Sequence, residues 1–311
     1  MELIGNTFSF PWEVELMSWL QNSLPESVIS ALSRLSFFGE EIFLVAVLGF
    51  IYWSYDKQAG RRLGISLLMI NVWAPMIKNV ALRRRPYMDH EQITLKRLVE
   101  KGADPMDISA QGYSFPSQHS ANAAGLLASL SMVFKKKWLG VIAVLLPLLV
   151  GVSRVAVGAH YPTDVMFGWI FGVLVSVVVQ ALDRKIPDRR IFYGLLLLTA
   201  LPGLFFCRSA DYFTGLGLLI GFVAGVAVDD KYVRFENTKS LVRRVLRVLG
   251  GAAVFLALSS LLKLPFSKDF LAGGTFPALL VRCARYAISC FVAFAIYPMV
   301  FKYTAKIGKT A

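Results

Sequence analysis

The sequence predicts an all-α fold, a polytopic bundle of helices that cross a membrane. The first observation behind this prediction is composition. Hydrophobic residues make up 56% of the 311-residue chain, and the mean hydropathy is +0.58. With the 24 Gly residues included, the apolar fraction rises to about 63%, compared with about 45–50% for soluble domains counted in the same way. This composition excludes a disordered chain, a fibrous repeat and an ordinary soluble enzyme.

The second observation is a series of apolar runs that are long enough to cross a membrane. A span needs about 20 apolar residues, so about nine spans would use about 180 residues. Nine runs of this kind fall at 37–55, 63–82, 118–134, 138–157, 163–182, 191–207, 212–228, 248–264 and 283–301. The run at 118–134 is less apolar, but its Ala and Gly residues suit a helix that packs tightly inside a bundle.

The third observation is the distribution of positive charge between the runs. The chain has 33 Lys and Arg against 20 Asp and Glu, a formal net charge of +13. Nineteen of the basic residues lie in every second loop, at 56–62, 135–137, 183–190, 229–247 and 302–311. Loops rich in Lys and Arg mark the cytoplasmic side. The net charge therefore indicates cytoplasmic loops, and no nucleic-acid partner is expected.

The N-terminal segment before the first run predicts helices of a different kind. Residues 10–35 are only moderately apolar. Within them, bulky apolar residues recur every four positions, at Leu16, Leu20, Leu24, Val28 and Leu32. This pattern favours one or two helices that lie in the membrane interface, with a break at Ser23 and Pro25.

Two glycine patterns predict close contacts between helices. Gly168 and Gly172 are four residues apart in one run, and Gly217, Gly221 and Gly225 repeat the spacing in another. Small residues at this spacing allow membrane helices to approach each other closely. The alternative is that glycine is merely tolerated inside a span.

The first chemically distinctive stretch is Lys78-Asn-Val-Ala-Leu-Arg-Arg-Arg85-Pro86, at the end of the second run. Lys78 and Arg85 are seven residues apart, or two helical turns, so both are predicted to point the same way. Pro86 is predicted to end the helix. The alternative is a basic anchor whose side chains extend to the membrane surface.

The second stretch is Pro116-Ser117-Gln118-His119-Ser120, which opens the third run. Ser117 is a favourable N-cap, and a helix that begins there presents the amides of Gln118 and His119 outward. Such a helix start is an anion site, where His119 would be placed to deliver a proton to a bound group. The alternative for a lone histidine is a polar residue at the membrane surface.

The third stretch runs from Ser153-Arg154 through His160 to Asp164, compressed between two apolar runs. Asp164 follows His160 by one helical turn, so it is predicted to hold one ring nitrogen and leave the other free to attack. Charged residues in this setting are costly and usually functional. Lys78, Arg85 and Arg154 together supply three positive charges for a dianionic group.

Paired carboxylates with metal-binding spacing are missing from the three stretches, so no metal and no cofactor is expected.

Together these stretches resemble the signature of the type-2 phosphatidic acid phosphatase (PAP2) superfamily: Lys-x6-Arg-Pro, Pro-Ser-Gly-His and Ser-Arg-x5-His-x3-Asp. The first and third match at every defined position, and the second departs from it with Gln118 where Gly is usual. The resemblance implies a metal-independent phosphatase. It implies that His160 is the nucleophile that forms a phosphohistidine, Asp164 its orienting partner and His119 the general acid. The implied phosphate ligands are Lys78, Arg85, Ser117, Gln118 and Arg154.

The expected organisation has three parts: interfacial helices at 1–36, a phosphatase core at 37–189 with the six-span layout of the family, and an extension at 190–311 with about three further spans. All three motifs fall on the less basic side, so the site is expected to be extracytoplasmic, in a plasma (inner) membrane. The expected substrate is a lipid phosphate or a lipid diphosphate, and homo-oligomerisation is left open.

Three alternatives share these motifs or this setting. A lipid phosphotransferase would use the same phosphohistidine and pass the group to an alcohol. A vanadium haloperoxidase carries the same motif set, although the membrane spans argue against it. A catalytically silent lipid-binding or transport protein is expected to lose a motif histidine, and both His119 and His160 are present here.

Overall fold

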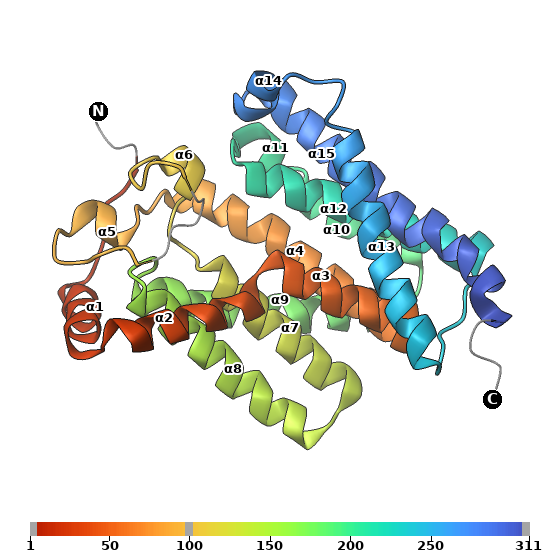
Figure 1. Ribbon diagram of the computed structural model, residues 1–311, viewed down its shortest axis with the longest axis horizontal. Helices are drawn as coiled ribbons and strands as arrows, with labels where there is room; N and C mark the ends of the chain where they lie inside the picture. Colours follow the sequence, from red (N-terminus) through yellow and green to blue (C-terminus); the bar gives the residue numbers. More distant parts are fainter. Residues whose placement is uncertain (1–4, 97–101, 307–311) are drawn as a thin grey trace. The chain divides into compact units, whose positions relative to one another are not determined.

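The computed structural model describes residues 5–96 and 102–306 (Figure 1). These ranges are helical and contain no β-strand, only an isolated bridge between Asn6 and Arg83. The predicted all-α fold is confirmed. By its internal contacts the chain forms two compact units, one made of 1–43 and 73–177 and the other of 44–72 and 178–311. Helices α4 and α9 each contribute to both units.

The first unit contains the N-terminal helices and the helices that carry the three motifs. Its elements are α1 (Pro11–Ser23), α2 (Glu26–Leu35), η1 (Ser36–Gly39), the end of α4 (Lys57–Ala81), α5 (Pro86–Asp89), α6 (Ile108–Gln111), α7 (Gln118–Phe134), α8 (Lys137–Ala156) and most of α9 (Pro162–Lys185).

The two N-terminal helices break where the sequence predicts. Helix α1 begins at Pro11, whose fixed φ suits a first helical position, and it ends at Ser23. Helix α2 begins after Pro25, and both helices pack against α8. Helix α1 also contributes Val14 and Met17 to a buried cluster with Tyr161. It is therefore part of the packed unit, and its place in a membrane interface stays a prediction.

Close approach of α7 and α9 depends on the glycines identified in the sequence. A Cβ at Gly168 would lie 2.6 Å from the carbonyl oxygen of Ser117, and one at Gly172 would collide with the carbonyl of Ala121. Any side chain at either position would push the helices apart. The predicted glycine contact is confirmed, and it brings the start of α7 against the start of α9.

The second unit consists of most of α3, η2, the start of α4, the end of α9 and the helices that follow α9. Its elements are α3 (Glu41–Phe50), η2 (Ile51–Tyr55), the start of α4, α10 (Arg189–Ala200), α11 (Gly203–Phe206), α12 (Ala210–Val228), η3 (Asp229–Val233), α13 (Leu241–Leu261), α14 (Lys268–Ala272), α15 (Phe276–Phe291), η4 (Val292–Ile296) and η5 (Tyr297–Lys306). Here Gly217 and Gly221 lie against the carbonyls of Cys283 and Ala287, which confirms the second glycine pattern.

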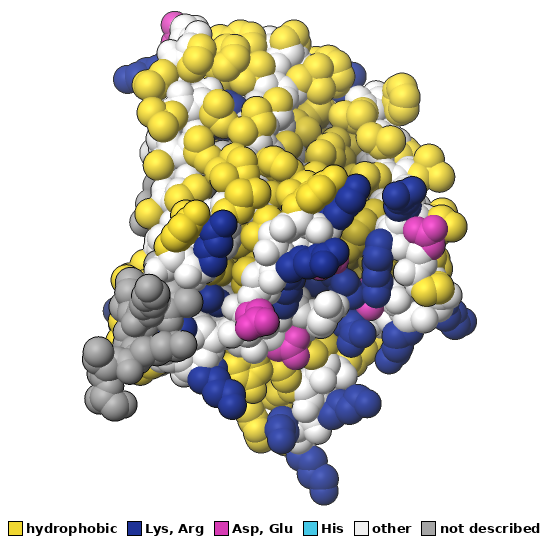
Figure 2. Space-filling model, turned by 90° about the vertical axis from the view of Figure 1, so that its right-hand side faces the viewer, with side chains coloured by type: hydrophobic (Ala, Val, Ile, Leu, Met, Phe, Trp, Pro, Cys, Tyr) yellow, Lys and Arg dark blue, Asp and Glu magenta, His cyan; other side chains and the backbone are white. Residues whose placement is uncertain are grey.

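The number of membrane-spanning helices is smaller than predicted. Within the described ranges, six helices are long and apolar enough to cross a membrane, and a bent pair over Glu26–Tyr55 would make a seventh. Two of the nine predicted runs account for most of the difference. Helix α7 has 17 residues, or about 25 Å, which is short of the roughly 30 Å hydrocarbon core. The first turns of α13 carry Arg243, Arg244 and Arg247. Figure 2 shows a face with extensive hydrophobic surface, on which Lys and Arg side chains gather in one area.

Candidate active site

The predicted site residues lie in the first unit, where the ends of four long helices meet. Lys78 is on the last turn of α4 and Arg154 on the last turn of α8. Ser117, Gln118 and His119 form the start of α7. Arg85 precedes α5, His160 is in the loop between α8 and α9, and Asp164 is in the first turn of α9.

His160 is the centre of this arrangement. Its side chain is almost completely buried, with 2% of the residue exposed. Burial lowers the pKa of His160 well below its usual 6.5, and the nearby charges of Arg85, Arg154, Lys78 and His119 lower it further. The ring is therefore neutral at physiological pH. A guanidinium nitrogen of Arg85 lies 3.4 Å from Nε2 of the ring.

Asp164 lies on the other side of the ring, although it does not bond to it. Its Oδ2 is 3.6 Å from Nδ1 of His160, which is too long for a hydrogen bond. Oδ2 instead accepts a bond of 2.8 Å from the backbone amide of Tyr161. Within the described ranges, the buried Nδ1 has no hydrogen-bond partner. The one-turn spacing thus brings the carboxylate and the imidazole together as predicted, through a contact longer than expected.

The prediction that Lys78 and Arg85 share one helix is wrong. Helix α4 ends at Ala81, because Leu82 adopts a left-handed backbone with φ of 50°. Pro86 does not end α4; it occupies the first turn of the short helix α5. The backbone beyond Ala81 is fixed by hydrogen bonds between Asn6 and the segment 82–84.

The two side chains nevertheless converge on one loop. Lys78 Nζ donates to the carbonyl of Tyr113 at 2.7 Å. Arg85 donates to the carbonyls of Gln111 and Gly112 at 2.7 and 2.9 Å. Gly112 has φ of 70° and ψ of 164°, a conformation that other residues rarely adopt. Loop 111–113 therefore orients two of the predicted phosphate ligands with neutral acceptors.

Helix α7 begins at Gln118 with Ser117 at the N-cap position, as predicted. The Ser117 hydroxyl does not cap an amide, because its Oγ bonds to Oγ of Ser120 at 2.9 Å. Gln118 has an ordinary helical start without a positive φ. Glutamine in place of the usual glycine is therefore compatible with the backbone at this position.

Sequence reasoning missed a buried ion pair network around Asp164. Arg83, only 1% exposed, donates to Oδ1 of Asp164 at 2.7 Å and to Oε2 of Glu13 at 2.8 Å. Glu13 is fully buried and also accepts from the hydroxyl and amide of Thr163. The guanidinium of Arg83 stacks over Tyr161, 3.9 Å from the ring centre. Glu13 is one of two glutamates in the N-terminal helix, and nothing in the sequence pairs it with an arginine 70 positions away.

Ser36 is a second residue that the sequence did not reveal. It is fully buried in η1, and its Oγ accepts from Arg154 at 3.2 Å and lies 3.0 Å from Oγ of Ser153. Gly39, at the end of η1, packs so closely on the backbone of His119 that a Cβ would lie 2.5 Å from its carbonyl oxygen. The segment that follows α2 thus contacts both the second and the third motif.

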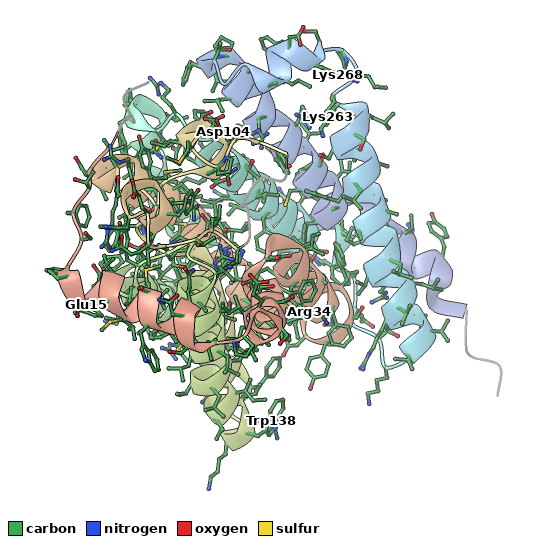
Figure 3. All side chains as sticks on the ribbon, turned by 60° about the vertical axis from the view of Figure 1, so that its left-hand side comes forward. Glu15, Arg34, Asp104, Trp138, Lys263 and Lys268 are labelled. Atoms are coloured by element: carbon green, nitrogen blue, oxygen red, sulfur yellow. The ribbon has the colours of Figure 1, made fainter. Side chains whose placement is uncertain are left out.

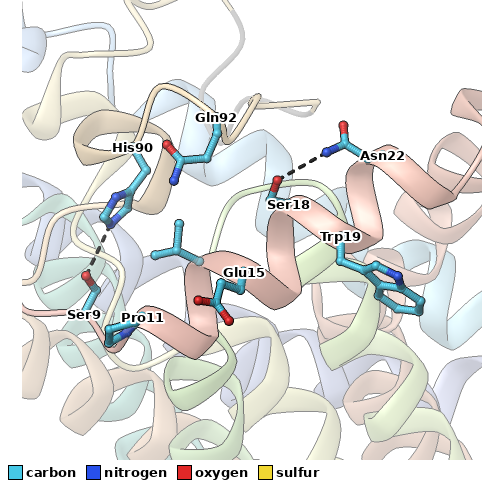
Figure 4. Close-up of a pocket in the computed structure, with 9 residues that line it drawn as sticks. Ser9, Pro11, Glu15, Ser18, Trp19, Asn22, His90 and Gln92 are labelled. Atoms are coloured by element: carbon cyan, nitrogen blue, oxygen red, sulfur yellow. Dashed lines mark hydrogen bonds between the residues drawn. The ribbon is translucent and has the colours of Figure 1, made fainter.

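A groove of about 710 Å³, with a mixed polar and apolar lining, lies beside α1 and contains none of the motif residues. Glu15, Ser18 and Asn22 line it from one face of α1, and His90 and Gln92 face them (Figure 4). The ring of His90 bonds to Ser9 at 3.3 Å and stands edge-on to Tyr161. Among the described residues, no group of three or more His, Cys, Asp or Glu is arranged to hold a metal ion.

Comparison with known protein families shows the family to which this chain belongs. Residues 59–187, which include all three motifs, match the family model of the PAP2 superfamily. Residues 213–308 match the model described as PAP2 superfamily phosphatase, transmembrane extension. This chain belongs to the PAP2 superfamily, and it is a multi-pass membrane phosphatase of all-α fold.

Several curated relatives are similar to it over most of their own length. The undecaprenyl-diphosphatase of Sulfolobus acidocaldarius is 26% identical over 61% of this chain and 88% of the relative. The decaprenylphosphoryl-5-phosphoribose phosphatase of Mycobacterium tuberculosis is 30% identical over 54% of this chain and 89% of the relative. Undecaprenyl-diphosphatase BcrC of Bacillus subtilis is 28% identical over 50% of this chain and 73% of the relative. No solved structure matches this chain significantly.

Proposed function

We propose that this protein hydrolyses a lipid phosphate or a lipid diphosphate without a metal ion, through a phosphohistidine on His160. The observation that carries the proposal is the setting of that ring. It is buried and neutral, with Asp164 near Nδ1 and with Arg85 near Nε2. A proton on Nδ1 faces the carboxylate, which leaves the Nε2 lone pair for attack on phosphorus.

The proposed reaction has two steps. Nε2 of His160 attacks the terminal phosphorus in line, the bond from that phosphorus to the oxygen of the leaving group breaks, and His119 gives its proton to that oxygen. The leaving group is the lipid alcohol of a lipid phosphate or the lipid monophosphate of a lipid diphosphate. Water then attacks the phosphorus of the phosphohistidine while His119 takes the proton, and the nitrogen–phosphorus bond breaks to release inorganic phosphate. Lys78, Arg85 and Arg154 stabilise the charge on the phosphoryl oxygens. The start of α7 presents the amides of Gln118 and His119 to the same group, while the amide of Ser117 donates to the carbonyl of Asp164.

Arg83 and Glu13 are proposed to position Asp164. A carboxylate that is held by Arg83 and by the Tyr161 amide cannot rotate away from the ring. Glu13 fixes Arg83 in turn, and it ties α1 to the first turn of α9 through Thr163. This network acts on the nucleophile through Asp164 and does not touch the substrate.

The substrate class follows from the chemistry of the site together with the relatives. The names of the relatives are those of phosphatases for polyprenyl diphosphates and a polyprenyl-linked sugar phosphate. We propose that the site lies on the extracytoplasmic side of the plasma (inner) membrane, because the motifs fall on the less basic side. A cysteine placed at 107 is expected to react with an impermeant thiol reagent in intact cells, and one at 136 to be shielded. The reverse pattern contradicts this topology.

Phosphate release from a panel of lipid phosphates and diphosphates tests the function, with purified protein in detergent and excess chelator. Release in chelator is expected, with inhibition by orthovanadate, which mimics the five-coordinate transition state. Addition of an acceptor lipid distinguishes a phosphotransferase by its transfer product, and bromide oxidation would identify a haloperoxidase. A strict magnesium requirement, or binding of lipid phosphates with no turnover on any of them, contradicts the proposal.

A further inference from the structure

A cavity in the second unit collects four positively charged side chains. It measures about 270 Å³ and lies where α13, α14 and α15 meet. Lys263, Lys268, Arg282 and Arg285 line it, together with three apolar residues of α14 and α15. Figure 3 shows Lys263 just beyond the end of α13 and Lys268 at the start of α14.

None of these four cations forms an ion pair with a carboxylate within 5–96 and 102–306. Arg285 is 6% exposed and donates to the carbonyl of Ser259 at 3.1 Å, while its Nε has no hydrogen-bond partner there. Arg282 donates to the hydroxyl of Thr214 at 3.3 Å. The two guanidinium groups are thus oriented by neutral acceptors that do not cancel their charge.

The positive charges of Arg282 and Arg285 destabilise this part of α15 unless an anion binds between them. Arg282 and Arg285 are three residues apart on α15, so they lie on one face of the helix and repel each other. Charged residues within membrane helices normally pair with one another or face a functional site. In the same unit Arg61 and Arg62 both pair with Asp183, whereas the buried Arg247 donates to the backbone carbonyls of Trp53 and Glu236.

The cavity also stands out from the charge pattern of the chain. Outside the five basic loops and the segment 78–101, only seven Lys and Arg remain, and four of them line this cavity. The turn between α13 and α15 lies outside the five basic loops, so the charge of those loops does not account for these four residues.

We propose that this cavity binds the phosphate of an anionic phospholipid. Its volume suits a headgroup and is too small for a whole lipid, since ligand sites for drug-sized molecules start at about 300 Å³. Arg282 lies about 9 Å along α15 from Phe276, near the headgroup level of a span that begins there. The strongly exposed side chains of Leu261 and Leu264, on the α13 side of the cavity, offer a surface for acyl chains.

Native mass spectrometry of the full-length protein in detergent tests this site. The probe is phosphatidylglycerol, a phosphodiester that a monoester phosphatase does not cleave, with phosphatidylcholine and inorganic phosphate as separate arms. We expect one tightly retained phosphatidylglycerol, and at least a tenfold weaker retention in Arg282→Gln/Arg285→Gln. The matched control is Arg184→Gln/Arg190→Gln, which removes two exposed arginines of the same unit and is expected to keep the lipid.

Two further measurements keep the result interpretable. Lys263→Gln/Lys268→Gln changes only exposed lysines, so it is expected to fold normally and still to weaken retention. Phosphatase activity in detergent reports whether each variant is folded, since none of these residues belongs to the catalytic site. Equal retention of phosphatidylglycerol and phosphatidylcholine, or equal loss in the control pair, overturns the proposal. Competition by millimolar inorganic phosphate without any preference for phosphatidylglycerol also overturns it and identifies a soluble anion as the ligand.

Discussion

The two sides of the His160 ring hold their arginines in different ways. On the Nδ1 side, Arg83 bonds to the carboxylates of Asp164 and Glu13. On the Nε2 side, Arg85 donates to the backbone carbonyls of Gln111 and Gly112. A carboxylate cancels the charge of a guanidinium, whereas a carbonyl orients it and leaves the charge in place. Two arginines from one basic run are thus held differently: Arg83 by the carboxylates of the protein and Arg85 by backbone carbonyls, which suits the proposed role of Arg85 as a phosphate ligand.

The second unit contains the same two arrangements. Arg61 and Arg62 pair with Asp183, while Arg285 donates to the carbonyl of Ser259 inside a cavity lined by cations. Arg247 of the same unit is also buried and also donates to carbonyls, those of Trp53 and Glu236, so a neutral acceptor alone does not indicate a phosphate site. Arg285 differs from Arg247 because it lines a cavity together with three other cations.

The largest loss of activity is expected from a substitution of His160 itself. His160→Ala removes the nucleophile and should abolish turnover outright. His90→Ala is the matched control, because His90 is half-buried near the same residues but bonds to Ser9 beside α1; it should keep activity within about tenfold. Acid-labile, base-stable phosphate trapped on the wild type and missing from His160→Ala would support the covalent step. Full activity of His160→Ala contradicts it.

Arg83→Gln is expected to cause the next largest loss of activity. It acts only on the Nδ1 side of His160, through Asp164. It leaves Asp164 and Glu13 buried without their cation, a loss of about 3–5 kcal/mol in stability for a broken buried pair. Loss of an oriented carboxylate should lower kcat by about 10²–10⁴-fold. KM should change little, since Arg83 does not face the substrate. Arg85→Gln should raise KM as well.

Arg84→Gln is the control for this comparison. Arg84 is the next residue in the chain and pairs with Asp89 at 2.8 Å, away from Asp164. Its removal should change kcat by less than about tenfold. An equal loss of kcat in Arg84→Gln and Arg83→Gln would show that the basic run acts by general charge, and that the network around Asp164 has no specific role.

Much of this arrangement is visible in the sequence, and the reasons for the misses are specific. Motif spacing predicted Arg154, His160 and Asp164 as site residues, which stays a prediction, and the glycine repeats predicted the observed contact of α7 with α9, because both patterns are local. Glu13 and Ser36 were missed because their partners lie 70 and 118 residues away. The end of α4 was misplaced because Leu82 turns left-handed, and no local residue signals this turn. The loop carbonyls that orient Arg85 carry no side-chain signature at all.

The pH dependence of kcat/KM is expected to reflect the neutral state of His160. Because its folded pKa lies well below the unfolded value of 6.5, the ring stays neutral in the fold as the pH falls below 6.5. The acid limb of kcat/KM should therefore lie well below 6.5, after correction for the titration of the substrate itself. The unfolded state takes up its proton first, so this residue makes the fold less stable as the pH falls from 6.5 towards the folded pKa. An acid limb at or above 6.5 would contradict a neutral nucleophile.

The smallest effect is expected at Gln118, where this chain departs from the family signature. Its backbone starts helix α7 with an ordinary φ, so the amide is presented to the site whatever the side chain is. Gln118→Gly should leave kcat/KM within about tenfold of wild type or raise it, since removal of a direct oxyanion donor costs about 10²–10³-fold. Ser117→Ala is the companion variant, because it removes the bond to Ser120 and keeps the same amides. Kinetics on the preferred lipid phosphate measures both. A loss of several orders of magnitude in Gln118→Gly would show that the Gln118 side chain itself contacts the substrate, and the departure from glycine would then be a determinant of specificity.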